Sequence, residues 1–508
     1  WGVAGYTICQ GVEQAGPLLL FDTLTYRISG HSPSDASSYR EKDEIAAWEK
    51  EDSIIDFGNS IVKHKVRSAG ELEEIRAMVG DAIVAALKLA IDDSLSPRMN
   101  PVKNPDVIAQ YMFSNQKIEK LDDRPIEVLI PKEENPRVKQ LATKSRVAKD
   151  AAGKEISKNK VLQFRDALFE AIIDGFYTDP TLAAWGEENR DWGGAFAVYR
   201  GLTEALPYHR LFNSSISEGA IVGAAVGYGM CGGRVIAELM YADFMGRAGD
   251  ELFNQLPKWQ AMSAGLIKMP VVIRISVGSK YGAQHSQDWT SLCTHIPGLK
   301  VVFPVTPYDA KGLMYSALRG TDPVIFFESQ RVYDMGEMFR SDVPREAYEV
   351  PFGEPDIKVA GKDLTIITVG ATLYPAVKAA EVLKNKYALE AEIIDLRTLV
   401  PINYEPIVAS VKKTGRVLLA SDACQRGSYL NDVAQNISEL AFDYLDAPPV
   451  VVGSRNWITP AYELEKHFFP QPEWLLDAIH ERILPLPGHT VTNNFSDLER
   501  IRLHKSGI

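Results

Sequence analysis

A repeated alternation of helical patterns with short, mainly apolar strand patterns constrains the fold of this chain more than any other feature. Between about residues 161 and 328, the strand patterns are Val235–Leu239, Val271–Ile275, Val301–Phe303 and Val324–Phe327. Apolar strands separated by helices are typical of a parallel sheet that is covered by helices on both faces. The sequence therefore predicts an α/β domain in this region.

A second alternation of the same kind follows toward the C-terminus. Leu364–Gly370 has the pattern of a buried strand, a helical pattern lies near Ala376–Lys386, and further strands are expected at Ala391–Leu396 and Arg416–Ala420. We expect a separate α/β domain with its own parallel sheet. At about 150 residues per domain, a chain of 508 residues has room for about three folded units.

The remaining segments are less regular. The N-terminal part combines an apolar strand at Pro17–Phe21 with a polar loop and a helix around Glu71–Asp92, where apolar residues recur at helical spacing. The next segment is rich in Lys, Glu, Asn and Pro and predicts a charged, partly flexible linker. The expected parts are 1–115, the linker 116–160, the α/β domains 161–350 and 351–485, and a tail 486–508.

Composition and charge exclude several classes of protein. With 55 Lys and Arg against 67 Asp and Glu, the net charge is -12, which argues against a nucleic-acid or anionic-membrane surface. The longest small-apolar run, Ala220–Met230, is far shorter than the roughly 20 residues that cross a bilayer. The four cysteines lie far apart, at Cys9, Cys231, Cys293 and Cys424. Their spacing indicates a reducing compartment, which we expect to be the cytoplasm or, alternatively, the mitochondrial matrix.

The densest chemical signal is the segment Ser215–Gly227. Ser217 is a suitable N-cap, which puts Glu218 in the first turn of a helix, and three glycines spaced four residues apart share one face of it. A first-turn glutamate can simply complement the helix dipole. Alternatively, a carboxyl in an apolar surround keeps a proton more readily and can share it with a ring nitrogen of a ligand. The residues alone leave both interpretations open.

The loop Gly278–Trp289 directly follows the apolar strand Val271–Ile275 and contains His285. Ligands of open α/β sheets bind at the carboxyl ends of strands, and imidazole suits proton transfer near neutral pH. His285 is therefore a candidate catalytic residue, although a loop histidine is more often simply solvated. A second polar loop, Tyr26–Arg40, contains Arg27 and His31. It fits either a surface loop with local Ser and Asp turns or an active-site loop that binds an anion.

A series of motifs occurs in order along the chain: Trp185–Glu188, Tyr199–Leu202, Ile216–Glu218, Ala283–Gln287, His295–Val302, Asp309–Leu313, Asp322–Glu328 and Asp395–Pro401. Together they resemble the beta-type subunit of the first, decarboxylating component of 2-oxo acid dehydrogenase complexes. Before them, Gly16–Leu20, Thr25–Arg27 and Gly30–Asp35 resemble the end of the alpha-type subunit of the same family. Ser29 departs from that pattern, because the family often has another histidine there.

The resemblance implies a transketolase-like thiamine diphosphate-binding fold, with a pyrimidine-binding domain at 161–350 and a second α/β domain at 351–485. It implies oxidative decarboxylation of a 2-oxo acid, pyruvate-like or branched-chain, with transfer of the acyl group to a lipoyl carrier. Thiamine diphosphate with Mg²⁺ is the implied cofactor, and a structural K⁺ is an additional candidate. The organic chemistry of such a reaction belongs to the cofactor, and the protein supplies geometry and proton control.

The resemblance also implies roles for single residues. Glu218 would bond the pyrimidine nitrogen of thiamine, and Phe244 would stack on the pyrimidine, although an aromatic residue after a strand is more often core. His285 would stabilise the intermediate and assist transfer of the acyl group. His31 would act from the side of the active site opposite His285, and Arg27 would help to hold the cofactor.

Acidic residues remain to be assigned. Asp250 and Glu187 match groups that line a path between paired active sites, but exposed helical carboxylates are commoner. Gly80–Ala82 with Asn100 superficially resembles a magnesium-diphosphate motif, yet it lies inside the expected helix and lacks the second glycine. We therefore assign no metal ligand to these residues. Since the chain opens at Trp1 without a methionine, we expect that motif upstream or on a partner chain.

The implied partners are an alpha-type diphosphate domain, a second copy of the chain in a two-fold assembly, and a lipoyl-bearing acyltransferase. No nucleic-acid or membrane partner is expected. Two other kinds of function stay open. One is a thiamine enzyme of the transketolase or acetoin-cleaving type, and the other is a non-catalytic scaffold or regulatory fragment.

Overall fold

The computed structural model describes residues 26–28, 31, 34–36, 38–118 and 120–493. The chain divides into two compact units, residues 1–104 and 105–508, so the first unit ends earlier than the expected residue 115. The strand expected at Pro17–Phe21 lies outside the described residues. Within the described part of the chain, no helix is long and apolar enough to cross a membrane.

Among its described residues, the first unit contains the helices α2 (Lys42–Lys50), α3 (Ser53–Lys63) and α4 (Ala69–Ile91). Helix α4 confirms the predicted helix. It begins with a capping box, in which the Glu71 N–H donates to Ser68 Oγ and the Ser68 N–H donates to Glu71 Oε2 at 3.2 and 2.7 Å. The apolar residues that predicted α4 are themselves exposed, among them Met78 and Ile83.

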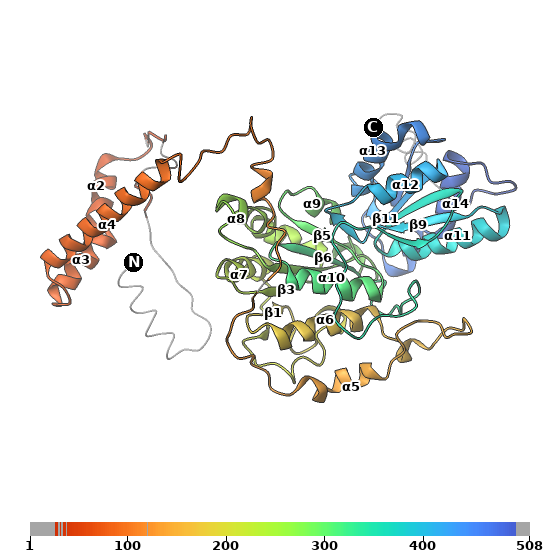
Figure 1. Ribbon diagram of the computed structural model, residues 1–508, viewed down its shortest axis with the longest axis horizontal. Coiled ribbons are helices and arrows are strands. Elements are labelled where there is room, and N and C mark those ends of the chain that lie inside the picture. Colours follow the sequence, from red (N-terminus) through yellow and green to blue (C-terminus); the bar gives the residue numbers. More distant parts are fainter. Residues whose placement is uncertain (1–25, 29–30, 32–33, 37, 119, 494–508) are drawn as a thin grey trace. The chain divides into compact units, whose positions relative to one another are not determined.

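The second unit contains a seven-stranded sheet in the order β10-β5-β6-β4-β3-β1-β2, and Figure 1 labels β1, β3, β5 and β6 of it. Its strands are β1 (Ala183–Gly186), β2 (Leu211–Asn213), β3 (Val235–Leu239), β4 (Val271–Val277), β5 (Lys300–Val302), β6 (Val324–Ser329) and β10 (Thr398–Val400). All neighbours are parallel except β10, which runs antiparallel to β5. Every residue of β4 is buried, as its mainly apolar pattern predicts, and the burial includes the charged Arg274.

The helices of this domain are α6 (Phe164–Thr178), α7 (Glu218–Met230), α8 (Leu256–Met262), α9 (Thr290–Thr294) and α10 (Pro307–Arg319). Helix α6 packs against α10, and α7 packs against β3 (Figure 1). Short helical segments, which carry η labels, lie between these main elements. They are η4 (Ala195–Ala197), η5 (Ala242–Ala248), η6 (Glu251–Gln255) and η7 (Gly282–Gln284).

The second domain has a five-stranded sheet in the order β12-β11-β8-β9-β7 (Figure 1). Its strands are β7 (Asp356–Val359), β8 (Leu364–Val369), β9 (Ala391–Asp395), β11 (Val417–Cys424) and β12 (Val450–Ser454). Its helices are α11 (Leu373–Tyr387), α12 (Glu405–Thr414), α13 (Tyr429–Ala441) and α14 (Pro472–Arg482). Only β7 is antiparallel to its neighbour, so the predicted α/β class with two mostly parallel sheets is confirmed.

Two features join these domains. Strand β10 belongs to the second domain in sequence but pairs with β5 of the first, with Thr398 opposite Val302. Next to it, the buried Asp309 carboxylate binds Arg397 Nη1 at 2.7 Å and also contacts Lys358 Nζ. Buried ion pairs of this kind are costly to break, because the remaining charge loses its partner. The two domains therefore form one unit.

Within the segment expected to be a partly flexible linker, 116–160, residues 130–146 contact helix α6, whereas residues 149–155 are exposed. The segment contains η2 (Lys132–Glu134), α5 (Pro136–Ala142) and η3 (Lys158–Lys160). The side chains of Arg137 and Lys144 bind the Asp166 carboxylate at 3.0 and 2.6 Å. Composition alone suggested solvated charges, whereas these cations are paired with a carboxylate of α6 that is itself buried.

Candidate active site

Helix α7 presents a buried carboxylate at its first residue. Glu218 is only 6% exposed, and the hydrogen bonds of the described residues include none to its carboxylate. Ser217 stands at the expected N-cap position, but its side chain makes no capping bond and donates to the Ser215 carbonyl at 3.3 Å instead. The carboxylate oxygens are not themselves fully buried, so a carboxylate that has no protein partner and keeps access to the space beside it is a candidate ligand group.

Segments η5 and η6 pack closely on the first turns of α7, because one glycine of α7 faces each of them. A Cβ atom on Gly219 would lie 3.3 Å from the Arg247 carbonyl oxygen, and one on Gly223 would lie 3.3 Å from Glu251 Cγ. The third glycine of the predicted face, Gly227, has no such neighbour. Segment η5, which carries Phe244, is thereby held against the turn that carries Glu218.

The predicted residues Phe244 and His285 lie together. The Phe244 ring is edge-on to the imidazole of His285, with 5.3 Å between ring centroids, and the Tyr241 ring is edge-on at the same distance. The His285 carbonyl accepts a hydrogen bond from Gln330 Nε2 at 2.7 Å. His285 is half-buried, so its ring is fixed by aromatic neighbours without being sealed from solvent.

Sequence reasoning missed several polar and aromatic neighbours of His285. Tyr241 stacks on Tyr281 with 5.9 Å between ring centroids, and burial raises the pKa of Tyr241 to about 12, so its hydroxyl keeps its proton at neutral pH. The Asp243 carboxylate accepts a hydrogen bond from the Gln287 N–H at 3.3 Å. Burial also raises the pKa of Asp243. Position was the available signal, because Tyr241 and Asp243 follow β3 as His285 follows the adjacent β4.

A buried charge network underlies these residues. Arg274 makes two bonds of 2.6 Å to the Glu328 carboxylate and a third, of 2.5 Å, to Glu238. Burial raises the pKa of Glu238 to about 7, although Arg274 acts in the opposite direction. The other Glu238 oxygen accepts the Ala195 N–H at 2.7 Å. The network therefore fixes the backbone at the start of η4.

Segment η4 in turn supports the aromatic wall of the site. Phe196 stacks on Tyr333 with 4.4 Å between ring centroids, and it packs edge-on to Tyr241 at 6.4 Å. The Tyr333 hydroxyl donates to the Glu328 carboxylate at 2.6 Å. A continuous set of contacts thus runs from the buried ion pairs to Tyr241, which is the neighbour of His285.

The two carboxylates assigned to a proton path lie in different surroundings. Glu187 is half-buried, and its pKa is raised by burial first and then by the charges of Glu218 and Glu188. Asp250 is exposed and accepts hydrogen bonds from Asn254 Nδ2 and Gln255 Nε2. Among the described residues no contact joins Asp250 to Glu187, so the path remains a prediction.

Arg27 and His31 belong to the first unit and are described within it. Arg27 Nη1 donates to the His31 carbonyl at 2.9 Å and lies 3.3 Å from His31 Nδ1. The His31 N–H donates to the Asp35 carboxylate at 2.8 Å. Both residues are exposed, so the loop presents a cation and an imidazole side by side. In the same unit, Gly80–Ala82 lies inside α4, as expected.

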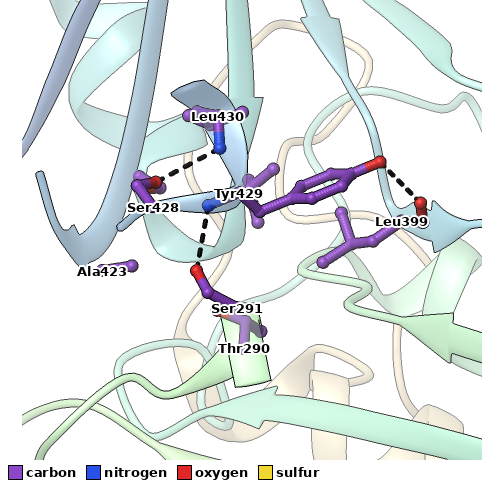
Figure 2. A pocket seen from close by; sticks show the side chains of 9 residues that line it. Thr290, Ser291, Leu399, Ala423, Ser428, Tyr429 and Leu430 are labelled. Atoms are coloured by element: carbon purple, nitrogen blue, oxygen red, sulfur yellow. Dashed lines mark hydrogen bonds between the residues drawn. The ribbon is translucent and has the colours of Figure 1, made fainter. Parts of the chain in front are cut away.

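A small pocket lies where the two α/β domains meet, at the carboxyl ends of β8 and β11 (Figure 2). The Tyr429 N–H donates to Ser291 Oγ at 2.9 Å, and the Tyr429 hydroxyl donates to the Leu399 carbonyl at 2.6 Å. The lining residues are Thr290, Ser291, Val369, Leu399, Ser421, Ala423, Ser428, Tyr429 and Leu430. These bonds tie α9 of the first domain to the start of α13.

Three family models match the chain. Residues 160–335 match the pyrimidine-binding domain of transketolase, and residues 353–475 match the transketolase C-terminal domain. Residues 9–98 match the dehydrogenase E1 component. The first two matches coincide with the two α/β domains of the second unit, and the third covers most of the first unit.

Similar proteins carry related names. The beta subunit of acetoin:2,6-dichlorophenolindophenol oxidoreductase of Cupriavidus necator is 43% identical over 298 residues, which are 56% of this chain and 86% of that subunit. The pyruvate dehydrogenase E1 component subunit beta of Rickettsia felis is 37% identical over 62% of this chain and 96% of its own length. The 2-oxoisovalerate dehydrogenase subunit beta of Bacillus subtilis is 35% identical over 63% and 98%.

Proposed function

This chain belongs to the thiamine diphosphate-dependent E1 dehydrogenase family, as a beta-type subunit preceded by an alpha-type fragment, and we infer that it oxidatively decarboxylates a 2-oxo acid and passes the acyl group to a lipoyl carrier. The observation that carries this proposal is Glu218, a residue that is 6% exposed and whose carboxylate has no hydrogen-bond partner among the described residues. It lies on α7, whose first turns pack against the segment carrying Phe244.

These residues fit the aminopyrimidine of thiamine diphosphate. A buried carboxyl without a protein partner is suited to share a proton with a ring nitrogen, and an aromatic ring beside it is suited to pack on a flat heterocycle. Glu218 would hold that proton, and Phe244 would contact the ring face. When bound, the cofactor supplies the electron sink that decarboxylation of a 2-oxo acid requires.

His285 would move protons at the reacting group. Its ring is held by two aromatic neighbours and remains partly open to solvent, which suits general acid–base work that is typically worth about 10² to 10⁴ in rate. From the family likeness, we assign cofactor-binding roles to His31 and Arg27 of the first unit as well. Mg²⁺ and the diphosphate would be held by an alpha-type domain that is encoded upstream or supplied by a partner. The chain would act in a two-fold assembly, and a lipoyl-bearing acyltransferase would bind there to accept the acyl group.

Cleavage of acetoin is a second candidate reaction. It is favoured by the relative with the highest identity among those described, whose name specifies acetoin. Both reactions use the same cofactor chemistry, so Glu218 and His285 would serve either one. Substrate choice depends on a few pocket side chains that differ in their contacts to the two substrates.

The test is a substrate panel on the native assembly. Decarboxylation of several 2-oxo acids and cleavage of acetoin are measured with thiamine diphosphate, Mg²⁺ and an artificial electron acceptor. Wild type is compared with Glu218→Gln and with Glu204→Gln, which changes an exposed glutamate of the same domain. Activity on one 2-oxo acid that is lost only in Glu218→Gln supports the proposal. Activity on acetoin alone selects the second candidate, and ketol transfer between sugar phosphates or no activity contradicts both.

A further inference from the structure

The loop that carries His285 begins with a backbone conformation that ordinary residues rarely adopt. After β4, Gly278, Ser279 and Lys280 have φ values of +66°, +99° and +80°. Glycine adopts positive φ freely, but Ser and Lys do so at a cost in energy, because the Cβ atom approaches the backbone. Such a conformation persists only where the surrounding structure holds it.

Glu465 of the second α/β domain contacts this turn at two points. Ser279 Oγ donates to Glu465 Oε2 at 2.7 Å, and the Lys280 N–H donates to Glu465 Oε1 at 2.5 Å. Glu465 belongs to η10 (Tyr462–His467), and it is the buried residue of that segment. Since each carboxylate oxygen binds a different residue of the turn, the contact fixes the orientation of the turn as well as its position.

The far end of the loop is held from the same segment of the second domain. Thr459 Oγ1 donates to Gln287 Oε1 at 3.0 Å. Between these two attachments, the only bonds to His285 among the described residues come from the Gln330 side chain and from aromatic packing. The intervening residues 280–281 and 283–284 are exposed. Residues 459–465 therefore contact both ends of the loop. The loop is further held by the bond from the Tyr281 N–H to Ser286 Oγ and by the bond from the Gln287 N–H to Asp243.

We propose that Glu465 is a positioning residue for His285, through which the C-terminal α/β domain holds the catalytic loop in place. The turn at Ser279 and Lys280 is strained, and it relaxes when the Glu465 carboxylate is removed. The loop then moves the imidazole of His285 away from Phe244 and Tyr241. The effect on catalysis rests on the proposed function of His285. The effect on the loop does not, and the two are measured separately.

Hydrogen exchange of the native protein measures the loop directly. We expect the amides of residues 279–287 to exchange at least about tenfold faster in Glu465→Ala than in wild type, because the turn loses both acceptors. Glu463→Ala removes an exposed carboxylate of the same segment and should leave exchange unchanged. Unchanged exchange in Glu465→Ala would overturn the proposal, as would faster exchange spread over the whole second unit.

Two further variants keep the test sharp if Glu465→Ala folds poorly. Glu465→Gln retains one acceptor oxygen, so its exchange should lie between those of wild type and Glu465→Ala. Lys280→Gly removes the cost of positive φ, so adding it to Glu465→Ala should restore part of the protection. If Lys280→Gly increases protection from exchange equally in wild type and in Glu465→Ala, the strain at Lys280 is not coupled to Glu465, and the proposal is contradicted.

Activity is then measured in the assembled enzyme with its cofactor. A misplacement of about 1 Å can cost roughly 10²-fold in rate, so we expect Glu465→Ala to lower the kcat of acyl transfer by about that factor. The KM for thiamine diphosphate, which depends on Glu218, should stay unchanged. Adding Glu465→Ala to His285→Ala should lower kcat no further, and a fully multiplicative loss would overturn the proposal. If wild type acts on no substrate, the proposed function fails, and hydrogen exchange still decides the role of Glu465.

Discussion

The imidazole of His285 and the ring of Phe244 lie edge to face, with 5.3 Å between their centroids. They come from segments that follow the parallel neighbours β4 and β3, in which Leu239 is opposite Ile275. Because parallel strands end at the same edge of a sheet, residues 41 positions apart in sequence are brought to one place. The pair therefore depends on the register of the sheet as well as on the two loops.

Phe244→Ala should weaken cofactor binding more than it weakens the fold. Loss of a ring that packs on a flat heterocycle removes about 1 kcal/mol or more, so we expect the apparent Kd for thiamine diphosphate to rise by about tenfold. Calorimetric titration of the assembly measures this. Phe442→Ala, which removes an exposed ring from the other α/β domain, is the control and should bind the cofactor as wild type does.

Arg274→Met should destabilise the second unit strongly. Removal of this cation leaves Glu238 and Glu328 without their partner in a site that is 1% exposed, and breaking a buried pair in this way typically costs about 3 to 5 kcal/mol. Urea unfolding followed by circular dichroism measures the change. Arg319→Ala breaks a partly exposed pair with Glu349 and should cost about 1 kcal/mol or less. Equal effects of the two variants would refute this account of the network.

The sequence predicted those elements whose pattern reflects their own burial. Strands β3, β4, β6 and β8 are mainly apolar because both faces of their sheets are covered, and the charged residues among them pair with one another. Helix α4 differs, because its apolar residues are exposed, but it begins at a capping box that local residues create. Strand β10 has three residues and joins the sheet of the other domain, so no local pattern could indicate it. The contacts between segment 116–160 and α6 could not be predicted for the same reason, because the α6 residues that the segment binds are remote in sequence.

The sequence predicted those candidate site residues whose place next to a helix start or a strand end is visible in the local pattern. Glu218 stood at an expected helix start and His285 in a loop after an apolar strand, and both expectations of local structure agree with the fold. Tyr241 was missed because an aromatic residue after a strand also fits the core. Glu465 could not be found, because it lies 185 residues from Lys280, which it contacts, and nothing local marks it.

Asp166→Asn should loosen the segment that was expected to be a linker. The Asp166 carboxylate binds Arg137 and Lys144, both of which are nearly buried, so the amide leaves two cations poorly compensated. We expect residues 135–146 to become more sensitive to limited proteolysis and the unit to lose about 2 kcal/mol or more of stability. Asp150→Asn, on an exposed turn of the same segment, should change neither. Equal resistance of both variants to protease would mean that these ion pairs do not hold the segment.

Asp395 should make the stability of the second unit fall as the pH rises. The carboxyl is fully buried, neither oxygen has a hydrogen-bond partner in the structure, and burial raises its pKa to about 7 in spite of Lys358. In the unfolded chain its pKa is about 3.9, so the folded state binds the extra proton. Its contribution to stability is complete below about pH 4 and is lost as the pH rises to about 7, at up to about 1.4 kcal/mol per pH unit.

Neighbouring Asp309 acts in the opposite direction, because Lys358 and Arg397 hold its pKa well below its usual range despite burial. Its stabilisation is present above its unfolded pKa and is lost as the pH falls. The difference between wild type and Asp395→Asn isolates the first effect, since both proteins contain Asp309. Urea unfolding between pH 4 and 8 should show that the variant gains stability relative to wild type as the pH rises, with the gain levelling off above about pH 7. A stability difference between wild type and Asp395→Asn that stays constant over this range would mean that Asp395 is ionised in the folded protein. Lys358 and Arg397 would then together balance the carboxylates of Asp309, Asp356 and Asp395 where the two domains meet.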